Sequence, residues 1–370
     1  MTSQHPQPGE SIVVGMSGGV DSSVAALLLK RAGAAVRGLF MRCWEDQSGD
    51  CPAGADAVAA AAAADAIGIE LDVVDLVGDY RREVFAGFLD ELRAGRTPNP
   101  DVWCNANIKF ASFARIAAAR YGATRIATGH YARIDGVRQR LLKAEAEGKD
   151  QTYFLYRLDR NQLAQSLFPL GDLPTKAQVR SIAREAGLPT AERRESMGIC
   201  FIGKRPFREF VSEHIRPQSG AIVDEHGRQI GTHDGVHLYT IGQRGGLGLG
   251  GEGPPWYVAG KDCATNTITA VRGRNHRLLY CRRVRLRQTS WVAGRPPPCN
   301  WVYTCRFRHR MEPAPCTLEQ AGAETATVAF ADEQAAVAPG QALVVYDGID
   351  CLGGGTIETT DLAARPAGRG

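Results

Sequence analysis

The segment Ser17-Gly18-Gly19-Val20-Asp21-Ser22-Ser23 determines how the first half of the chain is interpreted. An apolar run over 12–16 precedes it and a helical pattern over 24–30 follows, which predicts a buried parallel strand, a glycine-rich turn and a helix. Such a turn points backbone N–H groups at an anion, and the helix dipole adds to the attraction. The glycines admit phosphate oxygens closely, the serine hydroxyls can donate hydrogen bonds, and Asp21 can hold Mg²⁺ or cap the helix.

The same segment is not a Walker A loop, because no Gly-Lys-Ser/Thr follows it. It resembles the PP-loop of ATP pyrophosphatases, and this resemblance implies that ATP is cleaved to pyrophosphate and leaves AMP on a substrate. The alternative interpretation is an ordinary capped turn between a strand and a helix. The complete heptad in a strand–turn–helix context favours the phosphate site.

Composition sets the class of protein. The chain has 370 residues, enough for two or three domains, with 44% hydrophobic and 23% charged residues, as in soluble globular proteins. The first nine residues lack the features of a signal peptide and no apolar run is long enough to span a bilayer, so we expect a cytoplasmic protein without membrane contact. Ten cysteines without a Cys-x-x-Cys pair predict neither zinc nor an iron–sulfur cluster.

Alternating strands and helices extend the pattern. Strands are expected at 36–41, 69–76 and 123–128, with helices at 55–67 and 79–94, which predicts a doubly wound parallel α/β sheet. Ligands bind beyond the carboxyl ends of such strands. This rule brings the 17–23 segment, Met41 and Gly129-His130 to one edge, where Met41 either packs on adenine or belongs to the core.

Two cysteines are candidates for chemistry. Cys104 follows the proline-containing segment 95–103, and a helix is expected to start near Asn105, so the helix N-terminus and nearby Lys109 favour its thiolate. Cys200 has apolar neighbours that predict a strand and, by themselves, an inert thiol. Two separated cysteines near one nucleotide site would allow a persulfide on one and thiolate attack by the other.

The C-terminal part contains a basic run. Between 281 and 311 there are eight arginines and no aspartate or glutamate, and in places arginines alternate with apolar residues as in a strand. A basic β surface suits RNA. A solvated strand face is the ordinary alternative, but the absence of compensating acids over so long a stretch favours the RNA interpretation. Further upstream, a helix is expected from Asp150, mostly as core, and another over 174–187.

Several motifs together resemble the tRNA-specific 2-thiouridylases. They are Ser17–Ser23, Gly95–Cys104, Gly129–Tyr131, Asp150–Tyr156, Gly198–Gly203, Tyr239–Arg244 and Pro255–Val258, and the likeness runs from Ser11 to Ile357. The PP-loop alone is shared with other synthetases, whereas the combination is specific. The resemblance implies that the wobble uridine in a tRNA anticodon loop is converted to 2-thiouridine with ATP and transient Mg²⁺.

The resemblance also implies residue roles. It assigns ATP binding to Gly15, Met16, Ser17, Gly18, Gly19, Val20, Asp21, Ser22, Met41 and Gly129. It assigns the target base to Asn99, Pro100 and Asp101, the nucleophile to Cys104 and the persulfide to Cys200. It assigns tRNA contacts to His130, Lys149, Asp150, Gln151, Arg308, His309 and Gln341, with His309 standing where the family has tyrosine. A sulfur-relay protein or cysteine desulfurase would supply the persulfide.

We therefore expect a PP-loop domain over 1–205, a small β-rich linker domain over 206–280 and a C-terminal β-barrel over 281–370. Two other functions are considered. A PP-loop ligase or amidotransferase with a different acceptor would need no cysteine, and a non-catalytic tRNA-binding protein would keep tRNA affinity without releasing pyrophosphate.

Overall fold

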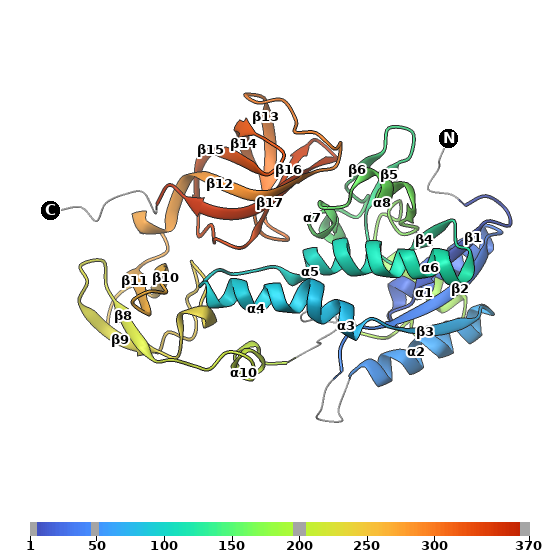
Figure 1. Cartoon of the computed structure of the whole chain (residues 1–370), viewed down its shortest axis with the longest axis horizontal. Helices are drawn as coiled ribbons and strands as arrows, with labels where there is room; N and C mark the ends of the chain where they lie inside the picture. The colour runs from blue at the N-terminus through green and yellow to red at the C-terminus, as the bar shows by residue number, and fades with distance from the viewer. Residues whose placement is uncertain (1–5, 46–51, 195–204, 363–370) are drawn as a thin grey trace.

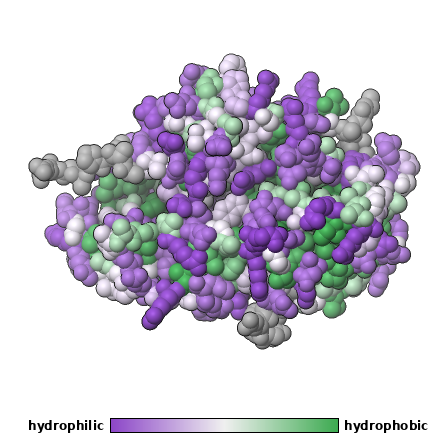
Figure 2. Space-filling model, in the orientation of Figure 1, coloured by the Kyte–Doolittle hydropathy of each residue, from purple (hydrophilic) through white to green (hydrophobic). Residues whose placement is uncertain are grey.

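The computed structural model describes residues 6–45, 52–194 and 205–362. An α/β region at one end of the molecule is followed by a small β-rich middle region and a β-barrel (Figure 1). Figure 2 shows hydrophilic side chains over most of one face, with hydrophobic areas between them. Within the described ranges, no helix combines the length and apolar character needed to cross a membrane.

The N-terminal sheet is parallel, as predicted. Its strand order is β3-β2-β1-β4-β7, and every neighbouring pair is parallel. The bounds are β1 (Ser11–Gly15), β2 (Ala35–Arg42), β3 (Leu71–Asp75), β4 (Arg125–Ala127) and β7 (Ser166–Leu167). The fifth strand, β7, has only two residues, too few to give a periodic signal in the sequence.

Helices cover both faces of this sheet. Ile12 and Val14 of β1 join one core cluster, with residues of α1 (Val20–Arg31), α2 (Pro52–Ile67) and α9 (Lys176–Glu185). Val13 joins the other cluster, together with Phe88 and Phe113. Because successive side chains of a strand point to opposite faces, one apolar run fills both cores. The helices around Phe88 and Phe113 are α3 (Val77–Tyr80), η1 (Arg81–Phe85), α4 (Ala86–Arg93) and α6 (Phe113–Tyr121).

One helix boundary differs from the prediction in a way that affects the site. The helix expected near Asn105 begins at Pro100, as α5 (Pro100–Trp103), and continues through the π-helical η2 (Cys104–Ser112) into α6. Asn99 is the N-cap, and its side-chain oxygen accepts from the backbone N–H of Asp101 at 3.2 Å. Proline is tolerated at the first helical position, so Pro100 opens the helix instead of excluding it. Cys104 therefore lies in the second turn, not at the N-terminus.

The middle region is a four-stranded sheet beside a short helix. Its strand order is β10-β11-β8-β9. The elements are α10 (Phe207–Ser212), β8 (Gly220–Val223), β9 (Gln229–His233), η4 (Val236–Leu238), β10 (Trp256–Asp262), β11 (Thr267–Arg272) and η5 (Arg277–Leu279).

The C-terminal sheet closes into a barrel because β12 pairs with both β15 and β17. Its strands are β12 (Tyr280–Trp291), β13 (Val302–Arg306), β14 (Ala314–Ala321), β15 (Thr325–Ala335), β16 (Ala342–Asp347) and β17 (Asp350–Thr360). Two strands of the N-terminal half extend it: β6 (Arg140–Leu142) pairs with β17, and β5 (Arg133–Asp135) pairs with β6. The remaining short helices are η3 (Glu147–Lys149), α7 (Thr152–Leu155) and α8 (Arg160–Ala164).

Candidate functional site

The turn between β1 and α1 is held by its own serines. The Ser17 backbone N–H donates to Ser22 Oγ at 3.1 Å, and the two hydroxyl oxygens also lie 3.1 Å apart. The hydroxyls of Ser22 and Ser23 both donate to the Gly19 carbonyl, at 3.1 and 3.0 Å. Gly19 is the N-cap of α1 and has no side chain to cap it. A preformed glycine-rich turn at a helix N-terminus is an arrangement that binds phosphate.

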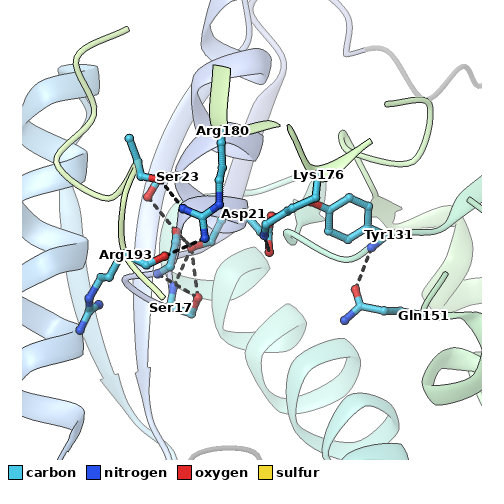
Figure 3. Close-up of polar contacts among 11 residues, drawn as sticks. Ser17, Asp21, Ser23, Tyr131, Gln151, Lys176, Arg180 and Arg193 are labelled. Carbon is cyan, nitrogen blue, oxygen red and sulfur yellow. Dashed lines mark hydrogen bonds and ion pairs between the residues drawn. The ribbon is translucent and has the colours of Figure 1, made fainter. Parts of the chain in front are cut away.

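Asp21, in the first turn of α1, is bound by groups from two other segments (Figure 3). Both of its carboxylate oxygens lie 2.6 Å from Lys176 Nζ, and the Tyr131 hydroxyl donates to Oδ1 at 2.8 Å. Gly129 passes so close that a Cβ there would lie 2.7 Å from the Asp21 carbonyl carbon and the Ser22 nitrogen. The predicted convergence of the turn and the Gly129 segment at one edge is therefore observed.

An arginine locks the other side of the turn. Arg193 Nη1 donates to the Gly18 carbonyl at 2.7 Å, while its Nη2 lies 2.7 Å from Asp56 Oδ1 in α2. Arg180 Nη2 in turn donates to the Arg193 carbonyl at 3.0 Å. Gly18 itself has φ +74°, a conformation that favours glycine.

Lys176 and Arg193 were not predicted from the sequence. Lys176 is the first residue of α9, where a positive charge is unfavourable because it opposes the helix dipole. This unfavourable placement was the sequence signal that could have marked Lys176 as a functional residue. Met41, at the end of β2, is nearly buried, and its Cε would lie 3.2 Å from a Cβ at Gly15. The structure thus brings Met41 beside the strand that leads into the turn.

The segment before α5 is fixed to the barrel and the middle region. The Thr97 backbone N–H donates to the Pro339 carbonyl at 2.8 Å, and Gln341 Nε2 donates to the Thr97 carbonyl at 2.7 Å. The Thr97 hydroxyl lies 3.3 Å from the Thr240 hydroxyl oxygen. In this structure Gln341 thus contacts the segment that leads to Asn99.

A charged triad reinforces this attachment. Glu91 of α4 accepts two hydrogen bonds from Arg96, both at 2.7 Å, and one from Arg287 of β12 at 2.6 Å. These hydrogen bonds lower the pKa of Glu91, although burial opposes them. The carboxylate therefore stays charged and links α4, the segment before α5 and the barrel.

Of the two candidate cysteines, Cys104 belongs to the described residues. Cys104 is fully buried and belongs to the core cluster that includes Val102 and Ile108. Cys200 lies outside the described residues. Asn99 and Asp101, expected at the target base, are half-buried, and Pro100 is buried.

The residues expected near the RNA differ in accessibility. Gln151 accepts from the Tyr131 backbone N–H at 2.8 Å. The His130 ring nitrogen Nδ1 lies 2.7 Å from the Thr128 hydroxyl, and burial, aided by the charge of Lys109, holds the pKa of His130 well below its usual value. Lys149 ends η3 and is half-buried.

Asp150 points inward. It is 2% exposed and accepts from the Thr152 hydroxyl at 2.8 Å and from Arg306 Nη1 at 3.3 Å. Burial raises its pKa, although those hydrogen bonds oppose the shift.

The barrel pair presents two different side chains. Arg308 is exposed and donates to the Ala336 carbonyl. His309 packs against Phe154 with 4.6 Å between ring centroids. Burial, aided by the neighbouring positive charges, lowers the pKa of His309 to about 4, so the ring is neutral at pH 7.

The basic run has partners that the sequence did not indicate. Arg283 pairs with Glu319 at 2.8 Å, Arg285 with Glu358 at 3.0 Å, Arg287 with Glu91 and Arg306 with Asp150. The premise that these arginines lack acidic partners therefore does not hold for these four. Their acidic partners come from neighbouring strands and from the N-terminal half, so a local count of charges could not find them.

Three family models match the chain in succession. They are described as a tRNA methyl transferase HUP domain (residues 10–204), a tRNA methyl transferase PRC-barrel domain (208–272) and an aminomethyltransferase beta-barrel domain (281–357).

Full-length relatives match as well. The tRNA-specific 2-thiouridylase MnmA of Methylobacillus flagellatus is 50% identical over 357 residues, 94% of this chain and 98% of that protein. The protein of the same name from Neisseria meningitidis serogroup C is 50% identical over 356 residues, 95% of this chain and 96% of that protein. A solved 4-thiouridine synthetase–RNA complex with bound ATP is 17% identical, covers 55% of this chain and 50% of that one, and has a TM-score of only 0.35.

Proposed function

This chain belongs to the family of tRNA-specific 2-thiouridylases, and on that premise we propose that it activates the 2-carbonyl oxygen of a tRNA wobble uridine with ATP and replaces that oxygen with sulfur. The chain is thus a tRNA sulfurtransferase that forms 2-thiouridine. The observation that carries the proposal is 50% identity over 94% of the chain to a protein of this activity. The adenylation and persulfide steps below are the proposed part.

ATP is the activating substrate, with its phosphates at the 17–23 turn. The N–H groups at the start of α1 would face the phosphates, and Lys176 would add a positive charge 2.6 Å from the Asp21 carboxylate. Mg²⁺ bound to nucleotide phosphates needs only one or two protein carboxylates, and Asp21, partly exposed at the turn, is suited to provide one. The bound ion would neutralise phosphate charge as pyrophosphate leaves.

Adenylation solves a leaving-group problem. The 2-carbonyl oxygen of uracil is a poor leaving group, and attack of that oxygen on the α-phosphorus of ATP converts it to the oxygen of AMP with release of pyrophosphate. The base must leave its stack to reach the pocket expected at Asn99 and Asp101. Asn99 is fixed there as the N-cap of α5.

Sulfur then arrives as a persulfide on Cys200, delivered by a donor protein. Its terminal sulfur attacks C2, a C–S bond forms, the C–O bond breaks and AMP leaves. The Cys104 thiolate next attacks the inner sulfur of Cys200. The S–S bond of the persulfide breaks, its electron pair stays on the sulfur bound to C2, and 2-thiouridine is released. Two thiol equivalents reduce the resulting Cys104–Cys200 disulfide.

Cys104 cannot take that step from its buried position. We propose that tRNA binding moves the segment before α5, which is held to the barrel through Thr97 and Gln341. If RNA replaces the contact between Gln341 and Thr97, the site around Cys104 would open only when the tRNA is bound.

The test is nucleoside mass spectrometry of unmodified tRNA incubated with the protein, ATP–Mg²⁺ and a persulfide donor. We expect an oxygen-to-sulfur mass shift at the wobble uridine that requires ATP. Cys104→Ser and Cys200→Ser should abolish it, whereas Cys299→Ser, a substitution at an exposed cysteine outside the proposed site, should not. A fully active Cys104→Ser/Cys200→Ser double variant would instead support amidotransferase or ligase chemistry. Retained tRNA binding without pyrophosphate release would support a non-catalytic binding protein.

A further inference from the structure

A hollow of about 380 Å³ lies between the N-terminal half and the barrel, away from the 17–23 turn. One wall is the turn of the β5–β6 hairpin with the start of α8, and the other is the loop between β12 and β13. Figure 1 shows this hairpin and that loop facing each other across the top of the molecule. Nothing in the proposed sulfur chemistry uses this hollow.

The hollow is strongly basic. Its lining includes four arginines, Arg138, Arg140, Arg160 and Arg295, and one acidic residue, Asp350. Arg140 bonds to both Asp350 and Asp135, so Asp350 already has a basic partner. Across residues 6–45, 52–194 and 205–362, no ion pair is found for the other three arginines, all of which are exposed. Within the basic run, Arg283, Arg285, Arg287 and Arg306 are paired with acids, whereas Arg295 in the hollow is not paired with any acid in the described part of the chain.

The opposite wall is rigid. Pro296, Pro297 and Pro298 line the hollow beside Arg295, and the Tyr303 hydroxyl donates to the Pro298 carbonyl at 2.9 Å. Consecutive prolines fix φ, so little conformational entropy remains to be lost when a ligand binds. The same loop ends at Trp301, which is 62% exposed. Rigid apolar groups beside unpaired arginines suit a ligand with both phosphates and flat rings.

We propose that this hollow binds phosphodiester groups of the tRNA substrate, at a distance from the target base; the inference rests on the proposed function. β16 begins beside Gln341, which contacts the target-base segment, and its far end leads to Asp350 in the hollow. Six residues at about 3.3 Å each place the two sites roughly 17–20 Å apart. A folded RNA that presents one base at Asn99 spans that distance with its backbone.

The guanidinium groups come from three segments that fold together only when the hairpin joins the barrel. RNA phosphates recur along a chain and can reach several arginines at once, whereas a small anion would satisfy one or two. The occupant is thus a polyanion, and binding of the target base at Asn99 determines which of its phosphates reach the hollow. The site contributes affinity and orientation, not chemistry.

The experiment measures binding of a fluorescent wobble-uridine tRNA transcript from 50 to 300 mM KCl. In a plot of log affinity against log salt concentration, each phosphate contact contributes a slope of about 0.7–0.9. At 0.15 M salt this slope corresponds to about a 4- to 5-fold gain in affinity for each contact. We therefore expect Arg138→Ala/Arg295→Ala to weaken binding roughly 15- to 25-fold and to reduce the salt slope by about 1.4–1.8. Arg31→Ala/Arg120→Ala is the matched control because both arginines are exposed, at the ends of α1 and α6 away from the ligand edge, and should change affinity less than 2-fold.

Unchanged affinity and slope in Arg138→Ala/Arg295→Ala would overturn the proposal, as would an equal loss in the control. Arg138→Lys/Arg295→Lys keeps the charges and should retain the slope, which separates charge from folding. Single-turnover thiolation at saturating tRNA should be unaffected in all variants. If the wild-type protein binds tRNA through these arginines but forms no 2-thiouridine, the proposed function fails while this inference stands.

Discussion

Replacing Gly18 by alanine tests whether the 17–23 turn has the conformation described. Gly18 has φ +74°, and a Cβ there would lie 2.3 Å from the Asp56 carbonyl oxygen and 2.8 Å from Arg193 Nη1. The first contact is with backbone and cannot be relieved by a side-chain rotation. Gly19, its neighbour, has φ −90° and only a 3.5 Å contact with Ser17 Oγ, so Gly19→Ala is a matched control in the same turn.

The expected cost for Gly18→Ala comes from two sources. A non-glycine residue in this backbone region costs about 1–3 kcal/mol. The clash also displaces the Arg193 guanidinium from the Gly18 carbonyl, and a hydrogen bond to a charged group contributes about 1.5–3 kcal/mol. Together they predict a loss of roughly 2.5–6 kcal/mol, which corresponds to about 5–24 °C in Tm for a region of this size. Gly19→Ala should lose less than about 1 kcal/mol.

The assay is thermal unfolding followed by circular dichroism, with the KM for ATP measured by pyrophosphate release below the transition. We expect Gly18→Ala to melt well below the wild type and to show a raised KM for ATP. A Tm within 2 °C of the wild type for Gly18→Ala would refute the described turn. So would an equal loss of Tm in both variants, because the two positions differ only in conformation and contacts.

Three further outcomes are expected. Lys176→Met should raise the KM for ATP about 10-fold or more in the pyrophosphate assay, because the positive charge beside the turn is lost; an unchanged KM would remove Lys176 from the phosphate site. Gln341→Leu should lower the Tm by no more than a few degrees while it changes the KM for tRNA, since Gln341 holds the Thr97 carbonyl; a tRNA titration with an unaltered KM would contradict that role. The Arg125 hydrogen bonds lower the pKa of Glu10 from 4.5 to about 2, so this pair contributes its stability above pH 4.5 and loses it as pH falls towards 2. Urea unfolding of Glu10→Gln should show about 1–3 kcal/mol less stability at pH 7 and a flatter decline in acid, and parallel pH curves for both proteins would contradict the assignment.

The parallel sheet was predictable because its central strand is buried on both faces. The apolar run of β1 is continuous and is followed by a glycine-rich turn and a helix signal, and a shorter apolar run, Leu39–Met41, marks β2. The start of α5 was not, since Pro100 is compatible with both a loop and a first helical turn. The hydrogen bonds from the Asp101 N–H to the Asn99 side chain and from the Cys104 N–H to the Pro100 carbonyl identify a helical turn, and both depend on the placed backbone.

The site was predictable where its residues are contiguous. The serines and glycines of the turn are recognisable as one motif, and Gly129 follows from the rule for strand ends. Lys176 and Arg193 contact the turn from positions 155 and 175 residues further along the chain, and apart from the unfavourable charge of Lys176 at the start of α9 no local pattern marks them. The ion pairs of the barrel arginines could not be predicted for the same reason, because strand register brings their acidic partners from distant parts of the chain.

The hairpin that joins the barrel imposes an order on how the protein is made. β6 pairs Leu141 with Cys351, so a strand formed early in synthesis waits for a partner roughly 200 residues away in the chain. At 5–20 residues per second, the ribosome leaves that edge uncovered for roughly 10–40 s. An unpaired strand edge invites association with other chains during that interval. Chains that stop before β17 would therefore be released with an exposed edge on the N-terminal half, which makes truncated products prone to aggregation even where that half has folded.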